Sequence, residues 1–341
     1  MNAFRRICAL ILGMALVVSG LLKIMDPAGS GLVVDEYFNF LHLGFLKGAS
    51  EFVGCTFAFL EGITGVALIC GVWRKITAIV SGVMLLFFTM LTAALVISGS
   101  EMDCGCFGEA VHLSNGQSLI KNLVFDALWC LAFIPLKNLG KPQRIKYVSF
   151  PLASLSLVFF LLYSVLSIPM RDYTKFKPGT ELDEQPLFFT DAAAVYADSL
   201  VMEGKVLAVS VYDLSGFGAG KVSRLSDFTS LAESRGFTPL ILTASVPEEA
   251  AGILMNPVLL AQTYFADRKE LMTLNRSNGG VTFISDGQII RKWASRNLPD
   301  AEELDAIVQK APMDYMISSQ NRTRALFQGF TLYLFAVLLL L

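Results

Sequence analysis

The chain has 341 residues, of which 54% are hydrophobic and only 16% are charged, and its mean hydropathy of +0.58 is far above that of soluble proteins. This composition predicts a membrane protein. The formal net charge of −2, with no stripe of basic residues, excludes a nucleic-acid-binding protein.

Apolar runs long enough to cross a bilayer predict five transmembrane helices, followed by a shorter run at the end of the chain. The runs cover residues 7–25, 52–72, 76–98, 118–136 and 146–168, and the short one covers 326–341. The first run lacks a small-residue cleavage site, so we expect a retained helix rather than a signal peptide. The short run is expected to be a marginal tail anchor or the stump of a longer native chain.

Basic residues predict which loops stay in the cytoplasm. They precede the first run, separate the second from the third, and separate the fourth from the fifth: Arg5, Arg6, Arg74, Lys75, Lys137, Lys141, Arg144 and Lys146. Residues 26–51 and 99–117 are then external loops. Because the fifth run ends outside, the polar stretch 170–325 is expected on the external side as well.

Three of the six cysteines are expected near the external surface, where disulfides persist. Cys104 and Cys106 belong to the sequence DCGCFG (residues 103–108) in the second external loop. Cys55 lies within a turn of the external end of the second run, so it can approach the same loop. The remaining cysteines fall near the cytoplasmic ends of the runs or inside one: Cys8, Cys70 and Cys130.

Two cysteines separated by one glycine are compatible with three kinds of site. A redox pair is favoured, because Cα atoms at this spacing lie roughly 5.5–7 Å apart and the strained ring is easily reduced. A metal site is least favoured, because two thiolates are too few and His112 lies at an unusual spacing for structural zinc. The third alternative is structural, with the cysteines as small apolar side chains beside a tight turn at Gly105 and Gly108.

Polar residues inside the apolar runs mark a second candidate site, because ionisable groups at membrane depth are costly. Glu61 is expected near mid-membrane, and Asn122 and Asp126 recur on one face of the fourth run. Lys23 lies near the external end of the first run, where lysine snorkels to the interface. At roughly 1.5 Å per residue, Lys23 and Glu61 differ in depth by about 10 Å, so no ion pair between them is predicted. Structural hydrogen bonding is the alternative to a functional role.

The first external loop contains EYFNFLHLGFLKGASEF (residues 36–52), in which aromatic and aliphatic residues alternate with polar ones. This pattern predicts an amphipathic helix that lies along the membrane interface.

Four motifs, in order, resemble the methylamine-utilisation MauE membrane domain, within the wider DoxX-like superfamily. They are SGLLKIMDP (19–27), FLEGITGVALICGVWRK (59–75), DCGCFG (103–108) and SLIKNLVFDALW (118–129). The resemblance covers residues 5–135. It implies a four-helix membrane bundle associated with envelope redox chemistry and with maturation of a disulfide-rich periplasmic methylamine dehydrogenase. The matching family positions are Lys23, Glu61, Cys104, Cys106, Phe107, Gly108 and Asn122.

The external stretch after the fifth run predicts an α/β domain. Strands are predicted at 206–213, 238–244, 262–267, 280–285 and 288–294, with helices at 221–235, 247–255, 267–275 and 300–310. This order resembles a thioredoxin-like domain. No cysteine follows Cys130, and Gly279 and Gly280 stand where such domains place a cis-proline. We therefore expect a recognition module without redox activity.

The predicted fold is a membrane α-helical bundle joined to an external α/β thioredoxin-like domain. Residues 1–136 form the MauE/DoxX-like four-helix domain, and 137–170 form a cytoplasmic loop and the fifth transmembrane helix. Residues 171–324 form the external domain, and 325–341 form a C-terminal transmembrane segment.

Two functions remain open. In the first, Cys104 and Cys106, with Cys55 as a relay thiol, exchange disulfides or electrons with an envelope protein and support its maturation. In the second, the chain is a non-enzymatic membrane scaffold or assembly factor whose thioredoxin-like module binds a partner. No cofactor or metal is predicted, although a quinone is compatible with the first function. The expected location is the cytoplasmic (inner) membrane, with the external domain on the periplasmic side.

Overall fold

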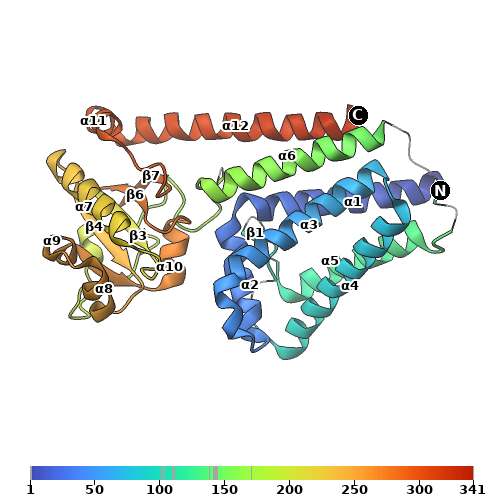
Figure 1. Cartoon of the computed structure of the whole chain (residues 1–341), viewed down its shortest axis with the longest axis horizontal. Helices are drawn as coiled ribbons and strands as arrows, with labels where there is room; N and C mark the ends of the chain where they lie inside the picture. Colours follow the sequence, from blue (N-terminus) through green and yellow to red (C-terminus); the bar gives the residue numbers. More distant parts are fainter. Residues whose placement is uncertain are drawn as a thin grey trace. The chain divides into compact units, whose positions relative to one another are not determined.

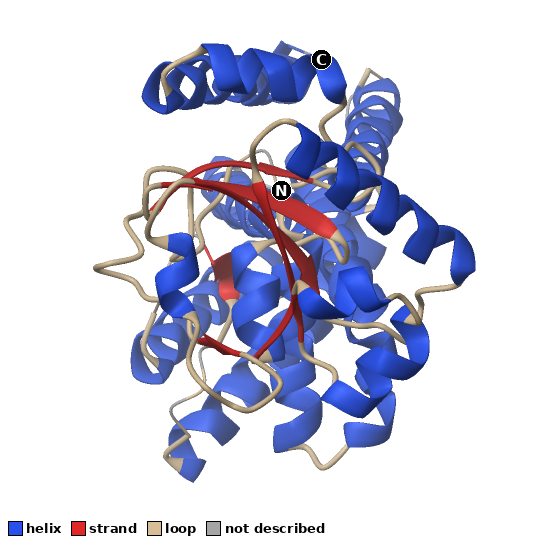
Figure 2. Cartoon of the chain, turned by 90° about the vertical axis from the view of Figure 1, so that its left-hand side faces the viewer, coloured by secondary structure: helices blue, strands red, loops and turns tan. Residues whose placement is uncertain are grey.

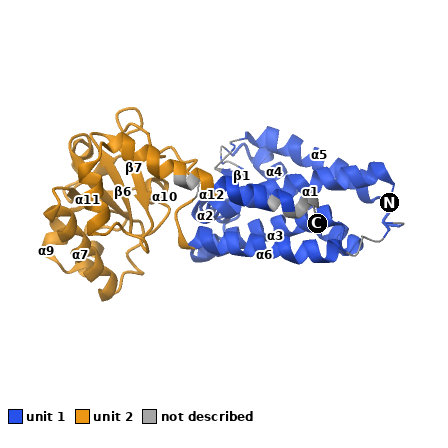
Figure 3. Cartoon of the chain, turned by 90° about the horizontal axis from the view of Figure 1, so that it is seen from above, with its two compact units in different colours: residues 1–165, 327–341 blue, residues 166–326 orange. Residues whose placement is uncertain are grey.

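The computed structural model describes residues 2–100, 102, 104–109, 111, 113–137, 139–140, 145–169 and 171–340. The chain divides into two units, residues 1–165 together with 327–341, and residues 166–326 (Figure 3). We call them the membrane unit and the α/β unit. Several residues of the expected loops lie outside the described residues: Glu101, Asp103, His112, Lys141 and Arg144.

The membrane unit is built from helices, and four of its helical segments are long and apolar enough to cross a membrane: Ala3–Met25, Gly44–Cys70, Arg74–Ser98 and Lys146–Leu166. Its elements are α1 (Ala3–Met25), α2 (Pro27–Phe40), η1 (Gly44–Ala49), α3 (Ser50–Cys70), α4 (Arg74–Ser98), β1 (Cys106–Glu109), α5 (Asn115–Phe133) and α6 (Lys146–Leu166). The predicted membrane helical region is therefore confirmed. In Figure 1, α1 runs beside α3 and α4 beside α5, and both pairs are in contact.

The fourth and sixth predicted spans differ from the other four. The run 118–136 forms α5, which packs against α1 and α4. This helix is not one of the four segments that are long and apolar enough to cross a membrane. Its charged side chains, Lys121 and Asp126, lower its hydropathy. The run 326–341 is the end of a longer helix, α12 (Pro312–Leu340), so the expected boundary at residue 325 falls inside a helix.

Small residues let α1 and α3 pack at very short range. A Cβ atom on Gly20 would lie 2.6 Å from the backbone nitrogen of Gly62, and one on Gly65 would lie 2.7 Å from the carbonyl oxygen of Gly13. Real Cβ contacts are never this short, so only glycine fits at Gly20 and Gly65. These close backbone contacts fix the register of α1 against α3 along their shared interface.

Residues 36–52 do not form the single amphipathic helix that their alternating pattern predicts. Helix α2 begins at Pro27, ends at Phe40, and packs on the first turns of α3, and the short 3₁₀ helix η1 follows it. Asp26 caps α2 by accepting a 3.0 Å hydrogen bond from the backbone N–H of Gly29. This cap, with Pro27 in the first turn, starts the helix nine residues earlier than the amphipathic pattern indicated.

The α/β unit contains all five predicted strands, with bounds that differ by one or two residues. Its elements are β2 (Phe189–Thr190), η2 (Asp198–Val201), β3 (Lys205–Val211), α7 (Ala219–Ser234), β4 (Thr238–Thr243), α8 (Pro247–Leu254), α9 (Pro257–Ala261), β5 (Thr263–Ala266), α10 (Arg268–Leu274), β6 (Gly280–Ser285), β7 (Gln288–Trp293) and α11 (Ala301–Gln309). The sequence patterns missed β2 and α9, which are too short to show a period.

The strands form one mixed sheet in the order β2-β5-β4-β3-β6-β7. Strands β3, β4 and β5 are parallel, whereas β6 is antiparallel to β3 and β7 is antiparallel to β6. Alternate residues of β3 face opposite sides, so Leu207 packs with Phe228 of α7 and Val206 packs with Leu271 of α10. Helices therefore cover both faces of the sheet (Figure 2).

A buried ion pair holds the first segment of the α/β unit against β7. The Nζ atom of Lys292 lies 2.6 Å from Oδ2 of Asp172, and the two side chains are only 6% and 17% exposed. Burial alone would raise the pKa of the Asp172 carboxyl, but the Lys292 ammonium and hydrogen bonds from Thr174 hold that pKa below its usual range.

Candidate functional site

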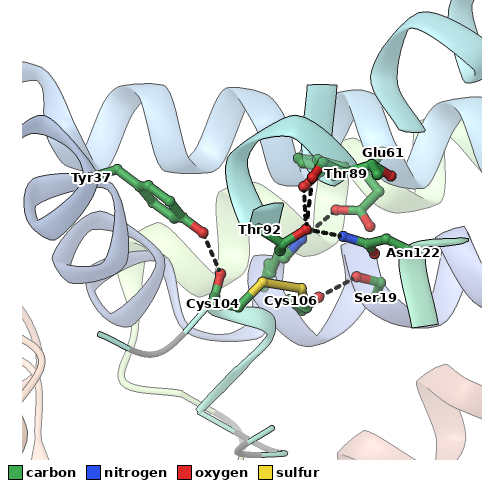
Figure 4. Close-up of a disulfide and its surroundings, with 10 residues drawn as sticks. Ser19, Tyr37, Glu61, Thr89, Thr92, Cys104, Cys106 and Asn122 are labelled. Atoms are coloured by element: carbon green, nitrogen blue, oxygen red, sulfur yellow. Dashed lines mark hydrogen bonds and ion pairs between the residues drawn. A yellow bond between two sulfur atoms is a disulfide. The ribbon is translucent and has the colours of Figure 1, made fainter. Parts of the chain in front are cut away.

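The two cysteines of the DCGCFG loop are joined to each other by a disulfide (Figure 4). Their Cα atoms lie 5.4 Å apart. Cys104 is buried, with 8% of its surface exposed, whereas Cys106 is half-buried at the start of β1. Cys106 is therefore the more accessible of the two residues.

Gly105 makes this short ring possible. Its φ of +61° lies in the left-handed region that favours glycine. A Cβ atom at this position would also lie 2.4 Å from Cγ1 of Val33 on α2. Both the backbone conformation and the close approach to α2 therefore require glycine between the cysteines.

Two hydroxyl groups from different helices hold the backbone on either side of the disulfide. Tyr37 of α2 donates a 3.2 Å hydrogen bond to the carbonyl oxygen of Cys104, and Ser19 of α1 donates a 2.6 Å bond to that of Cys106 (Figure 4). Burial, with a smaller contribution from Glu36, raises the pKa of Tyr37 to about 12, so its hydroxyl remains a neutral donor. The pair is thus attached to both α1 and α2.

An ion pair lies in the same part of the bundle, one helical turn along α1 from Ser19. The Nζ atom of Lys23 lies 2.6 Å from Oε2 of Glu61, and the side chains are 15% and 4% exposed. The ammonium also lies 5.2 Å from the ring centroid of Phe88 on α4. β1 reaches this region too, because Gly108 lies against the backbone of Leu22 and Lys23.

This pairing corrects the expectation that Lys23 and Glu61 lie at different depths. The close approach of Gly20 and Gly62 brings both residues to the same level of the α1–α3 interface. The first turns of α3 lie beyond the end of α1, against α2, where Gly54 of α3 meets Ser30 of α2. Counting residues from the start of each run therefore overestimated the depth of Glu61.

The polar residues of α5 form hydrogen bonds to α4. The amide of Asn122, which is buried, donates a 3.1 Å bond to Oγ1 of Thr92 (Figure 4). Asp126 accepts a 2.8 Å bond from Thr89. Cys130, four residues further along the same helix, is exposed and is a free thiol. The predicted polar face of α5 therefore serves helix packing at Asn122 and Asp126.

Cys55, the proposed relay thiol, is half-buried on α3 and is free. Since Cys104 and Cys106 pair with each other, the structure does not join Cys55 to either of them. Within the described part of the chain, no group of three or more histidine, cysteine or acidic residues gathers where it could hold a metal ion.

A shallow pocket lies beside the disulfide, with room for roughly one water molecule. It is lined by Cys104, Gly105, Cys106, Gly108, Val111, Leu113 and Ser118. Ser118 belongs to the first turns of α5, is fully buried, and has no hydrogen-bond partner for its hydroxyl among the described residues. Sequence patterns missed Ser118, as well as Ser19 and Tyr37, because single hydroxyl residues in apolar or aromatic surroundings carry no distinctive spacing.

Residues 1–135 match the family model described as methylamine utilisation protein MauE. The match runs from α1 to just beyond the end of α5, and it contains the disulfide, the ion pair and the pocket. The MauE resemblance is therefore confirmed for the membrane part. The α/β unit lies outside the match. No curated protein and no solved structure matches the chain significantly.

Proposed function

We propose that this membrane protein is a thiol–disulfide exchange protein that supports the maturation of a partner in the cell envelope, with Cys104 and Cys106 as the exchanging pair. The observation that carries the proposal is a disulfide between nearly adjacent cysteines, held at both carbonyls by Tyr37 and Ser19. The family that matches the membrane part is named for methylamine utilisation. No residue selects methylamine itself, so we define the partner by its chemistry, as an envelope protein with two thiols.

The difference in exposure between Cys104 and Cys106 determines which of the two cysteines the partner attacks. A thiolate of the partner attacks Sγ of Cys106, which is more accessible than Cys104. The bond between Cys104 and Cys106 breaks, and its electron pair remains on Cys104 as a thiolate. The second thiol of the partner then attacks the mixed disulfide and releases Cys106. The partner is oxidised by two electrons, and the cysteine pair is reduced by two.

The location belongs to the same proposal. The basic residues Arg5, Arg6, Arg74 and Lys75 favour a cytoplasmic side that leaves the disulfide loop and the α/β unit outside, on the periplasmic face of the inner membrane. Disulfides persist in that compartment.

For the α/β unit we propose a thioredoxin-like recognition module. Two parallel strands, β3 and β4, followed by an antiparallel hairpin, β6 and β7, support this fold. The loop after β3, where thioredoxins carry their cysteines, has none and is instead joined to the loop before β6. There, Asn278 donates a 2.7 Å hydrogen bond to the carbonyl of Asp213. The unit is therefore suited to binding and not to exchange.

A stoichiometric oxidation assay tests the proposed function. The full chain, purified with its disulfide intact, is mixed with reduced ribonuclease as a model dithiol protein. We expect one protein disulfide formed for each chain reduced, and no oxidation by the Cys104→Ser variant, because that variant has no disulfide to exchange. The Cys130→Ser variant, which removes an exposed thiol outside the pair, should behave as the wild type.

One observation favours the alternative function, a scaffold whose C-G-C turn is structural. Gly105 and the hydroxyls of Tyr37 and Ser19 hold the loop so closely that a permanent cross-link would serve packing alone. The alternative predicts that both cysteines never exchange, and that the Cys104→Ser/Cys106→Ser double variant still supports full partner maturation. Either result would refute the exchange proposal.

A further inference from the structure

The pocket beside the disulfide contains a polar group that the disulfide form does not use. The hydroxyl of Ser118 is fully buried, makes no hydrogen bond within the described residues, and lines the same pocket as both cysteines. Buried hydroxyls in native proteins nearly always have a partner. The Ser118 hydroxyl is therefore a donor that an acceptor entering this pocket would satisfy.

We infer that Ser118 donates a hydrogen bond to the Cys104 thiolate that forms when the disulfide opens, and so helps to set the redox equilibrium of the pair. This inference rests on the proposed function. When the partner attacks Cys106, the S–S bond breaks and the electron pair stays on Sγ of Cys104. That sulfur is then free to turn into the pocket, where Ser118 is the buried donor without a partner.

The pocket's size and position select a thiolate over a larger ligand. Room for roughly one water molecule accommodates a displaced sulfur atom but excludes a quinone ring. The pocket also adjoins the N-terminal end of α5, where Ser114 caps the helix and Leu113 lines the pocket. The positive end of a helix dipole stabilises anions and lowers thiol pKa values. Ser118 and the helix end therefore act in the same direction.

Charged residues on the surrounding elements also affect a thiolate, so the test compares variants in which those residues are unchanged. They are Lys23 on α1, Asp35 and Glu36 on α2, Glu61 on α3 and Lys121 on α5, and the side chain of Glu109 lies outside the described part of the chain. Glu101 and Asp103 lie outside the described residues. Since all of these groups are common to wild type and variants, a shift caused by Ser118→Ala reports the lost hydroxyl.

The full chain offers matched controls. Ser154 of α6 also has a buried hydroxyl without a partner among the described residues, but it does not line the pocket. Ser154→Ala therefore controls for the general loss of a buried hydroxyl in the membrane unit. Ser118→Thr retains the donor and controls for the substitution at this site.

The first measurement equilibrates each purified chain with glutathione redox buffers and counts free thiols on Cys104 and Cys106 by alkylation and mass. Loss of the donor destabilises the reduced state, so Ser118→Ala should shift the equilibrium about tenfold toward the disulfide, which is about 30 mV for a two-electron couple. Ser118→Thr should restore the wild-type equilibrium, and Ser154→Ala should leave it unchanged.

The second measurement uses the Cys106→Ser background, in which Cys104 remains as the free thiol of the loop. The pH midpoint of its alkylation rate should rise by about one unit when Ser118→Ala is added, because one pKa unit corresponds to a tenfold change. A purely structural role for Ser118 would not move this midpoint.

The outcomes separate this inference from the proposed function. If Cys104 and Cys106 of the wild type never exchange with glutathione, both are overturned. If the pair exchanges but Ser118→Ala shifts neither the equilibrium nor the midpoint, or if Ser154→Ala shifts them equally, only the role of Ser118 is wrong. Should Ser118→Ala fold poorly, an altered midpoint in Ser118→Thr would equally contradict the inference, because that variant keeps the donor.

Discussion

Lys23 of α1 and Glu61 of α3 form an ion pair, 2.6 Å between Nζ and Oε2, at the level where Gly20 and Gly62 bring the two helices together. The ammonium is also placed against the ring of Phe88 on α4. The pair thus connects three helices beneath the loop that carries the disulfide.

Removing one member of this pair should cost much more than removing both. Glu61→Gln or Lys23→Met alone leaves a buried charge without its counterion, which costs about 3 kcal/mol of unfolding free energy. The double variant should recover most of that loss, because no charge remains to be desolvated. Thermal unfolding of the detergent-solubilised chain measures the four proteins, and Lys75→Met, at an exposed lysine, serves as the control. Additive losses in the double variant would show that the pair is not coupled.

The α1–α3 contact predicts a sharp difference between two glycine substitutions. Gly20→Ala places a methyl group 2.6 Å from the Gly62 backbone and should destabilise the membrane unit by about 1–3 kcal/mol. Gly116→Ala, in the first turn of α5 with no atom within 4 Å, should be neutral or stabilise by up to about 1 kcal/mol. The same unfolding measurement compares them, and equal effects would contradict the close packing.

The buried pair of Asp172 and Lys292 predicts an acid-sensitive α/β unit. Because the folded-state pKa of Asp172 lies below its unfolded value of about 3.9, its contribution is complete above that pH and is lost as the pH falls through the folded-state pKa. Asp172→Asn should lower stability by about 3 kcal/mol at pH 7, and this difference should shrink as the pH falls through the folded-state pKa of Asp172.

Calorimetry of the full chain from pH 2 to pH 7 measures this dependence, with hydrogen exchange to assign the transition of residues 166–326. Glu270→Gln is the matched control, since its pair with Lys175 is more exposed and should contribute less than about 1 kcal/mol. A constant difference between wild type and Asp172→Asn at all pH values would rule out the titration of Asp172 as the cause.

The proposed orientation of the chain in the membrane predicts which positions an impermeant maleimide labels in intact cells. Ser215→Cys, at an exposed site of the α/β unit, and Cys106 after mild reduction should be labelled from outside. Lys75→Cys, at an exposed position in the first turn of α4, should be labelled only after lysis. Labelling of Ser215→Cys only in lysed cells would reverse the assigned orientation.

Hydropathy and residue period determined the outline of this protein from the sequence alone. A bilayer requires long apolar segments, so the four membrane-crossing helices were evident, and strands with buried faces required the apolar runs that became β3, β4 and β6. The loop of Cys104 and Cys106 was equally evident, because two of the six cysteines stand there with one glycine between them.

The arrangement around that loop was decided only by tertiary structure. The level at which Lys23 meets Glu61 depends on the register of α1 against α3, which is set by backbone contacts at Gly20 and Gly62 and by the turns of α3 that lie beyond α1. Ser118 became a candidate only when the fold placed its buried hydroxyl in the pocket of the disulfide. Hydropathy gives each residue a depth along its own helix, whereas chemistry depends on distances between helices, and those are fixed only once the side chains pack.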